Sequence, residues 1–327
     1  MTKPPLSRRN GLFVVLALAA AAIAATIVFL MRGGPEFVEY RMPLELESPT
    51  AIAAGADGAV WFTIDRSDVI GRVRNGTVDR LSTSGRNLEP LGIGVAPDGT
   101  AWFTDSVGGS VAHMTAAGEV SRFKLDTPIV RLGRLAVSPD GSPWFAELTS
   151  FSVTQIKDGR IIRHDVESPR GGPYGVAVAP NGVAWATLQA GDQLLRIDTD
   201  GHRESFDVPH PGAVPSDIAI GSDGSVWFIE ARGNRIGRFL NGKFAEFEVG
   251  VQNAGLSGIA IAKDGSVWFG MLREAGLGRL RDGKVSIFHL PRKDARPFSV
   301  AIDPPNNVWY ADISGYVGML PARFAGN

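Results

Sequence analysis

The chain has 327 residues, with 33 Lys and Arg against 34 Asp and Glu and a formal net charge of −1. A protein that binds nucleic acid through its phosphates needs a concentrated basic surface, so this balance argues against nucleic acid as a partner. The absence of cysteine excludes disulfides, thiolate zinc sites and a cysteine nucleophile, and the 40 glycines indicate many tight turns.

The first 32 residues have the pattern of a targeting segment. Lys3, Arg8 and Arg9 precede an uncharged run over residues 11–31, which as a helix is long enough to cross a ~30 Å hydrocarbon core. Positive charge before such a run predicts a membrane anchor, with residues 33–327 outside the cytoplasm as a periplasmic or extracellular domain. The alternative is a cleaved signal segment, which would release a secreted protein.

Residues 33–327 consist of one unit repeated seven times. Each unit contains one tryptophan, at intervals of 41 or 42 residues: Trp61, Trp102, Trp144, Trp185, Trp227, Trp268 and Trp309. Four short β-rich runs make up a unit, and Asx-Gly pairs such as Asp57-Gly58 and Asn75-Gly76 join them. Asx-Gly predicts a type I′ hairpin, which requires positive φ at both central residues. Four antiparallel strands repeated in this way are typical of an all-β protein, a seven-bladed β-propeller.

The second strand of each unit shows how the blades pack. Residues 226–228, Val-Trp-Phe, are apolar on both faces, which predicts a strand buried between two neighbouring blades. The tryptophans are therefore expected in the core between blades. The seventh unit ends without a fourth strand, and residues 36–43 have the pattern of one. We expect this N-terminal strand to complete blade 7 and close the ring.

The blade pattern Pro-x-Gly-Ile-Ala-Val, Asx-Gly-x-Val-Trp-Phe and Asn-Arg-Ile-Gly-Arg, clearest in residues 215–239, resembles the virginiamycin B lyase (streptogramin lyase) family over residues 36–327. The resemblance implies a propeller that linearises cyclic streptogramin B depsipeptides by a metal-assisted elimination across an ester. It also implies histidines in loops of the last two blades, and glutamates that hold Mg²⁺.

Those implied positions are occupied by other residue types in this chain. The histidine position, eleven residues before the tryptophan, is Ser257 in blade 6 and Phe298 in blade 7, and neither side chain can move a proton at neutral pH. The position of one metal-binding glutamate is Arg296, whose charge opposes a metal ion. Only Asp312 retains a carboxylate, so the family's catalytic residues do not carry over.

Other residues are candidates for a site on the channel face. Carboxylates stand three residues after four of the tryptophans, where they are expected to meet around the central channel: Asp105, Glu147, Glu230 and Asp312. They would bind Mg²⁺ or Ca²⁺ through oxygen, or pair with arginines. The loops add candidate ligand-binding residues: Arg131, Arg134, Tyr174, Asp217, Arg296 and Phe298. His210, between two prolines, is a candidate catalytic residue.

Two functions remain open at this point. The missing histidines favour an exported, membrane-anchored propeller without lyase activity that binds a small molecule, peptide or protein on its channel face. The acidic residues favour an enzyme, either a metal-dependent lyase with rearranged residues or a propeller that processes a lactone or ester. A shared fold does not decide between them.

Overall fold

A computed structural model describes residues 36–84, 89–126, 131–166 and 172–326. The expected membrane anchor at residues 11–31 lies outside these ranges, as does the rest of the targeting segment. Within these ranges, the structure contains no helix with the length and apolar character that a membrane crossing requires.

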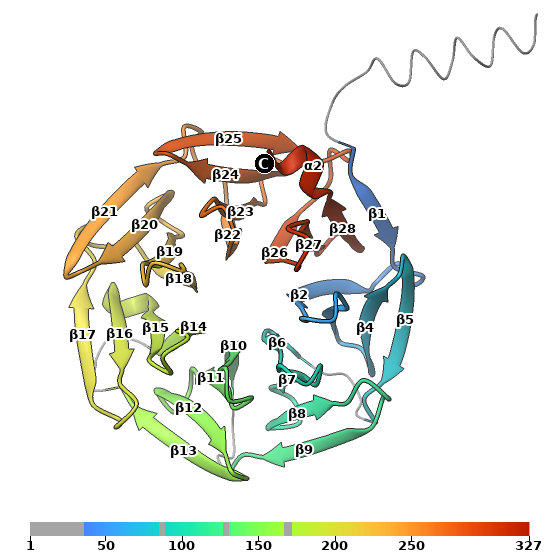
Figure 1. Cartoon of the computed structure of the whole chain (residues 1–327), viewed down its shortest axis with the longest axis horizontal. Helices are drawn as coiled ribbons and strands as arrows, with labels where there is room; N and C mark the ends of the chain where they lie inside the picture. Colours follow the sequence, from blue (N-terminus) through green and yellow to red (C-terminus); the bar gives the residue numbers. More distant parts are fainter. Residues whose placement is uncertain (1–35, 85–88, 127–130, 167–171, 327) are drawn as a thin grey trace, which may run out of the picture. The chain divides into compact units, whose positions relative to one another are not determined.

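The described residues form a ring of seven antiparallel sheets with four strands each, which confirms the seven-bladed propeller (Figure 1). We number the blades by their tryptophans. Blades 1 and 2 contain β2 (Ser48–Ala54), β3 (Val60–Asp65), β4 (Val69–Arg74), β5 (Thr77–Ser82), β6 (Ile93–Val95), β7 (Ala101–Asp105), β8 (Ser110–Met114) and β9 (Val120–Lys124). Blades 3 and 4 contain β10 (Leu132–Val137), β11 (Pro143–Glu147), β12 (Ser152–Lys157), β13 (Arg160–Asp165), β14 (Pro173–Val178), β15 (Ala184–Leu188), β16 (Gln193–Ile197) and β17 (Arg203–Asp207).

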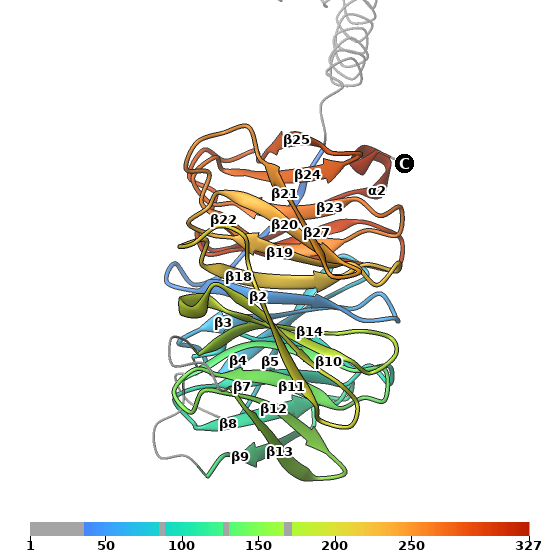
Figure 2. The same ribbon diagram turned by 90° about the vertical axis from the view of Figure 1, so that its left-hand side faces the viewer.

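The remaining blades repeat this order. Blades 5 and 6 contain β18 (Pro215–Ile220), β19 (Val226–Glu230), β20 (Arg235–Leu240), β21 (Lys243–Glu248), β22 (Leu256–Ile261), β23 (Val267–Met271), β24 (Gly276–Arg281) and β25 (Lys284–His289). Blade 7 contains β26 (Pro297–Ile302), β27 (Val308–Asp312), β28 (Tyr316–Leu320) and β1 (Val38–Arg41). The first strand of each blade lies nearest the centre and the fourth lies outermost, while the connecting loops gather at the two faces of the ring (Figures 1 and 2).

The hairpins within a blade are of two kinds. Between the third and fourth strands of blade 1, Asn75 and Gly76 both have positive φ, of 50° and 75°, as a type I′ turn requires. In the same turns of blades 2 and 4, only the glycines, Gly118 and Gly201, have positive φ. Between the first and second strands the type I′ prediction is wrong, because only Gly58 has positive φ, at 79°. This loop is longer, and the Gly58 amide donates to the carbonyl of Gly55 at 3.0 Å. Asp57 contributes through its side chain, which accepts the amide two residues ahead at 3.1 Å.

The apolar core lies between blades. Trp61 of blade 1 is 1% exposed and belongs to one cluster with Ile93 and Phe103 of blade 2. Six of the seven tryptophans are buried in this way, while Trp227 is half-buried and donates its indole N–H to Ser225 at 2.8 Å. A blade therefore cannot bury its second strand without its neighbours, so the ring folds as one unit.

The ring closes through β1, which pairs antiparallel with β28 so that Val38 lies opposite Met319. The ring of Tyr40 in β1 stacks on Trp309 with centroids 6.3 Å apart. The pairing leaves no open edge between the first and last blades. Only two short helical elements accompany the described strands, the 3-10 turn η1 (Gln189–Gly191) and α2 (Ala322–Ala325).

Candidate functional site

Four of the six predicted ligand-binding residues meet at the centre of the ring, on first strands of different blades. Arg134 in β10 is 6% exposed, and its guanidinium lies over the rings of Phe298 at 5.1 Å and Tyr174 at 5.9 Å. Its Nε lies 3.6 Å from the carboxylate of Asp217. The first strands line the centre of the ring (Figure 1). The contacts of Arg134 therefore bring together side chains of blades 3, 4, 5 and 7.

Protein groups engage the guanidinium of Arg134 from several directions. It donates to the carbonyls of Leu91 at 3.1 Å, Thr50 at 3.4 Å and Phe298 at 3.4 Å. Burial works against its charge, but the Asp217 carboxylate favours it, and the pKa of Arg134 is raised on balance. A cation that bonds carbonyls from three other blades is suited to hold the centre of the ring together.

The other two predicted ligand-binding residues lie elsewhere. Arg131 is exposed at the start of blade 3 and bonds through its backbone amide to Thr149 at 3.1 Å. Arg296 lines a pocket of about 750 Å³, formed by loops of blades 6 and 7 together with Arg273 and Lys293. We call this the basic pocket; its residues are Leu272, Arg273, Lys293, Asp294, Ala295, Arg296, Ile313 and Ser314.

The four predicted metal-binding carboxylates do not gather around the channel. They end second strands, one strand out from the centre, and all are at most 2% exposed. Two of them pair within their own blade with an arginine on the fourth strand: Asp105 with Arg122 at 3.1 Å, and Glu147 with Arg163 at 3.1 Å. These arginines are not the loop arginines considered from the sequence. The third strand lies between the second and the outer strand, and these two carboxylates reach across it to their arginines, away from the channel.

In blade 7 a single arginine bridges two carboxylates. Arg292, in the linker before β26, bonds Asp312 through one amino group, and its Nε lies 3.1 Å from the carboxylate of Glu39 on β1. The hydroxyl of Tyr310 also donates to Glu39, at 2.9 Å. We call Glu39, Arg292 and Asp312 the blade 7 group; it is a closed set in which one permanent cation bonds both acids.

The residues at the family's catalytic positions do not fit Mg²⁺. Asp312 already accepts hydrogen bonds from Arg292 and from two backbone amides. Ser257 is buried and donates to a backbone carbonyl at 2.6 Å, while the Phe298 ring lies under Arg134. Arg296 brings a positive charge where the resemblance implies a metal-binding glutamate. These positions therefore offer no set of free oxygen ligands to Mg²⁺.

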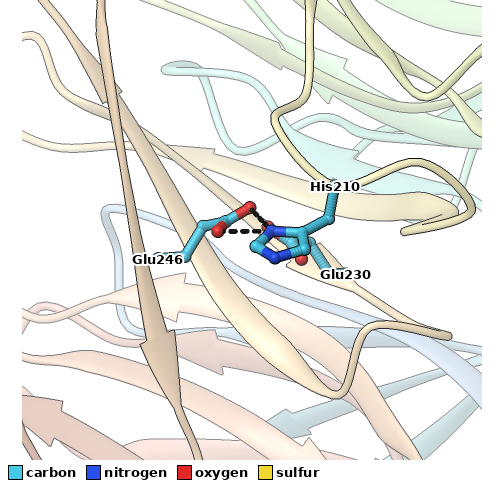
Figure 3. A group of neighbouring side chains, drawn as sticks. All are labelled: His210, Glu230 and Glu246. Carbon is cyan, nitrogen blue, oxygen red and sulfur yellow. Dashed lines mark hydrogen bonds and ion pairs between the residues drawn. The ribbon is translucent and has the colours of Figure 1, made fainter.

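A different group gathers in blade 5, from His210, Glu230 and Glu246. The Nδ1 of His210 lies 2.8 and 2.6 Å from the two carboxylate oxygens of Glu246, and Glu230 lies next to them (Figure 3). One potential ligand atom from each residue lies within 4.8 Å of the others, and no other such group of three occurs among the described residues. The side chains of His210, Glu246 and Glu230 are 50%, 15% and 0% exposed. We call these residues the blade 5 group.

Glu230 is the unsatisfied member of this group. Neither of its carboxylate oxygens has a hydrogen-bond partner among the described residues. Arg235 approaches only to 3.9 Å, because Glu248 holds its Nε at 2.8 Å. Burial and, next, the negative charge of Glu246 disfavour the ionised form of Glu230, and a hydrogen bond to Glu246 that requires the proton favours its protonated form, so that the pKa of Glu230 is raised to about 8. A buried carboxylate without a donor is costly unless it binds a proton or a cation.

The blade 5 and blade 7 groups occupy equivalent positions of the repeat. His210 and Arg292 each stand 17 residues before the tryptophan of their blade. Glu246 and Glu39 each lie on the outer strand opposite a glycine of the third strand. His210 and Glu230 can be selected as candidates from the sequence, but Glu246 cannot. Only an alignment of the fourth strands places Glu246 at the same position as Glu39. Blades 2 and 3 have Arg122 and Arg163 at this outer-strand position.

Comparisons with known proteins agree with the fold. The chain matches the Virginiamycin B lyase family over residues 24–192 and 77–323. It is 31% identical over 192 residues to a virginiamycin B lyase of Nocardia farcinica, covering 58% of this chain and 65% of the relative. It is 38% identical over 56 residues to a virginiamycin B lyase of Bordetella parapertussis, covering 17% of this chain and 19% of the relative.

Solved structures show the same architecture. A streptogramin B lyase structure superposes with a TM-score of 0.83 at 23% identity, covering 87% of this chain and 96% of that one. A catalytically inactive virginiamycin B lyase from Staphylococcus aureus with quinupristin superposes with a TM-score of 0.82 at 22% identity, covering 87% and 98%. The family match spans most of the propeller, and this chain belongs to the virginiamycin B lyase family.

Proposed function

We propose that this protein is a ligand-binding member of the family that takes a small anionic molecule into the basic pocket. The observation that carries the proposal is the charge of the pocket wall: Arg273, Lys293 and Arg296 stand against one acid, Asp294. Even with the full charge of Asp294 counted, the wall keeps more positive than negative charges. The pocket therefore presents excess positive charge to a ligand.

The chemistry of the wall defines the class of ligand. Arginine forks bind planar carboxylates and phosphates with paired hydrogen bonds, and lysine adds a compact charge. A volume of about 750 Å³ lies in the range of small-molecule sites, ~300–1,000 Å³. Arg296 reverses the charge that the family resemblance implies at its position, which supports a change of ligand from a metal ion to an anion.

Calorimetric titration of the full-length protein with citrate and with inorganic phosphate tests this proposal. We expect binding of at least one of these anions that weakens as salt is raised, and that Arg296→Glu weakens at least tenfold. Lys284→Glu is the matched control, because Lys284 is equally exposed but lies outside the pocket. The proposal fails if neither anion binds, or if both variants weaken binding alike.

We also propose that residues 11–31 hold the propeller at a membrane, outside the cytoplasm. The uncharged run and the basic residues before it support this placement. The expected outcome is recovery of the protein in the membrane fraction, where added protease reaches the propeller in intact spheroplasts. Recovery in the culture medium would instead support a cleaved signal segment.

A second candidate function, elimination or ester opening, is favoured by one observation. His210 is half exposed and bonds Glu246 through Nδ1, which leaves Nε2 to act as a base oriented by a carboxylate. In an elimination, such a base removes a proton from carbon as the neighbouring C–O bond breaks and a carboxylate leaves. We expect no linearisation of a streptogramin B depsipeptide, with or without Mg²⁺, by mass spectrometry. A linear product that disappears in His210→Ala would favour this second function.

A further inference from the structure

The blade 7 group shows what the repeat does with two carboxylates at these positions, one buried and one partly exposed. Glu39 and Asp312 share a built-in cation, Arg292, and Tyr310 adds a hydroxyl donor to Glu39. Every acidic group in this set is satisfied by the chain itself. Comparison with blade 7 therefore shows which interactions are missing at the same backbone positions of blade 5.

Blade 5 has the two carboxylates without the cation. Its imidazole, His210, is shorter than an arginine and bonds only Glu246, while Glu230 remains buried with no hydrogen-bond partner among the described residues. The residue after the tryptophan is Phe228, so the hydroxyl that Tyr310 provides in blade 7 is absent as well. An unpartnered buried carboxylate aimed at a second carboxylate and an imidazole indicates a place for an external cation.

We propose that the blade 5 group binds one divalent transition-metal ion, with His210 Nδ1 and carboxylate oxygens of Glu230 and Glu246 as its ligands. One imidazole nitrogen and two carboxylate oxygens suit Zn²⁺ or Mn²⁺, whereas Mg²⁺ and Ca²⁺ prefer ligand sets made of oxygen alone. The metal takes the place of the protons held among these three side chains, and its binding releases them to the solvent.

The geometry allows such a site with little movement. The ligand atoms lie within 4.8 Å of one another, and around a tetrahedral zinc ion they would be roughly 3.4 Å apart. Glu230 is fixed in the core at the end of β19, and His210 is the half-exposed member, so the ion enters from the His210 side. Three protein ligands leave a coordination position open to water or to a ligand.

The experiment uses the full-length protein, purified without an affinity tag and stripped with a chelator. After incubation with Zn²⁺ and gel filtration, we expect one Zn²⁺ per chain by elemental analysis. At a zinc concentration 100 times the Kd, we expect a rise of about 5 °C in Tm. Mg²⁺ under the same conditions should produce no such rise. His210→Ala and Glu246→Gln should each weaken zinc binding at least 100-fold.

Two further variants keep the test decisive. His202→Ala is the matched control, because it removes an exposed histidine outside the group and should leave zinc binding unchanged. His210→Arg inserts the cation of blade 7 and should abolish zinc retention in a protein with an unchanged β-sheet spectrum. The proposal is overturned if the wild type retains no zinc, which would leave a proton shared by the two carboxylates. It is also overturned if His210→Ala and Glu246→Gln retain zinc as the wild type does.

Discussion

Blades 5 and 7 both bring together a linker residue, an acid at the end of the second strand and an acid on the outer strand. The two acids are bonded by a cation in blade 7 but not in blade 5. In blade 7 the linker residue is Arg292, and it joins the outer-strand and second-strand acids into a closed set. In blade 5 the linker residue is His210, which reaches only the outer-strand acid, Glu246. An arginine carries a permanent charge and several donors in a fork, whereas an imidazole is shorter and not permanently charged at neutral pH.

This difference distinguishes a group that stabilises the fold, in blade 7, from a group that is able to bind a ligand, in blade 5. The register of the strands fixes where the two acids lie, and the residue in the linker decides whether they are neutralised. A closed set such as the blade 7 group stabilises the ring and cannot take a ligand. An incomplete set such as the blade 5 group costs stability and is where function can reside.

Loss of the bridging arginine should give the largest effect. Arg292→Ala leaves the buried carboxylate of Asp312 and the partly exposed carboxylate of Glu39 without a cation, and we expect the free energy of unfolding to fall by about 3–5 kcal/mol. Urea unfolding measures the change. Arg66→Ala is the control and should change little, since the Arg66 side chain is 82% exposed. A loss below about 1 kcal/mol for Arg292→Ala would show that the blade 7 group does not hold the ring.

The unsatisfied acid of blade 5 should make stability depend on pH. Folded Glu230 keeps its proton up to about pH 8, whereas a glutamate in the unfolded chain releases it near its ordinary pKa of 4.5. The stability linked to Glu230 is therefore fully present below pH 4.5 and is lost as the pH rises toward 8. Unfolding in chelator across this window should show a decline that is smaller in Glu230→Gln.

The matched control for this decline is Glu204→Gln, because Glu204 lies on β17, the outer strand of a different blade, and its side chain is 49% exposed. This variant should retain the decline of the wild type. An equal decline in Glu230→Gln and the wild type would place the titrating group elsewhere.

Replacement of His210 by arginine should give the acids of blade 5 the ion pairs that Arg292 makes in blade 7. In chelator at pH 8, His210→Arg supplies both carboxylates with a cation, and we expect a gain of about 1 kcal/mol, limited by the half-exposed position. Chemical unfolding measures the gain. A destabilised His210→Arg variant would show that the two blades are not equivalent around this position.

The smallest effect should come from the hydroxyl that only blade 7 has. Tyr310→Phe removes the donor to Glu39, which Arg292 still neutralises, so we expect a loss of about 1 kcal/mol. Phe228→Tyr adds the corresponding hydroxyl near Glu246 and should be neutral or slightly stabilising. If both substitutions destabilise by the same amount, the effect comes from ring packing and not from the hydrogen bond.

Many individual residues of the site could be predicted from the sequence, but the groups that they form with one another could not. His210 and Glu230 can be selected from the sequence by residue type and place in the repeat. Four residues near the starts of the first strands can be selected in the same way: Arg134, Tyr174, Asp217 and Phe298. Their partners could not be predicted in the same way. Glu39 and Arg292 are 253 residues apart in sequence, and they meet only because β1 completes the last blade.

The sequence by itself determined the all-β fold, the seven blades and their order, because the tryptophan recurs in every unit and Asx-Gly turns recur in the first six, and both are local signals. It also determined which side chains stand at strand ends. Only the tertiary structure decided which charges face each other, because that depends on cross-strand register and on the linkers between blades. The four strand-end acids consequently became two pairs within a blade, one bridged set and one incomplete group, although the sequence presents them as four equivalent positions.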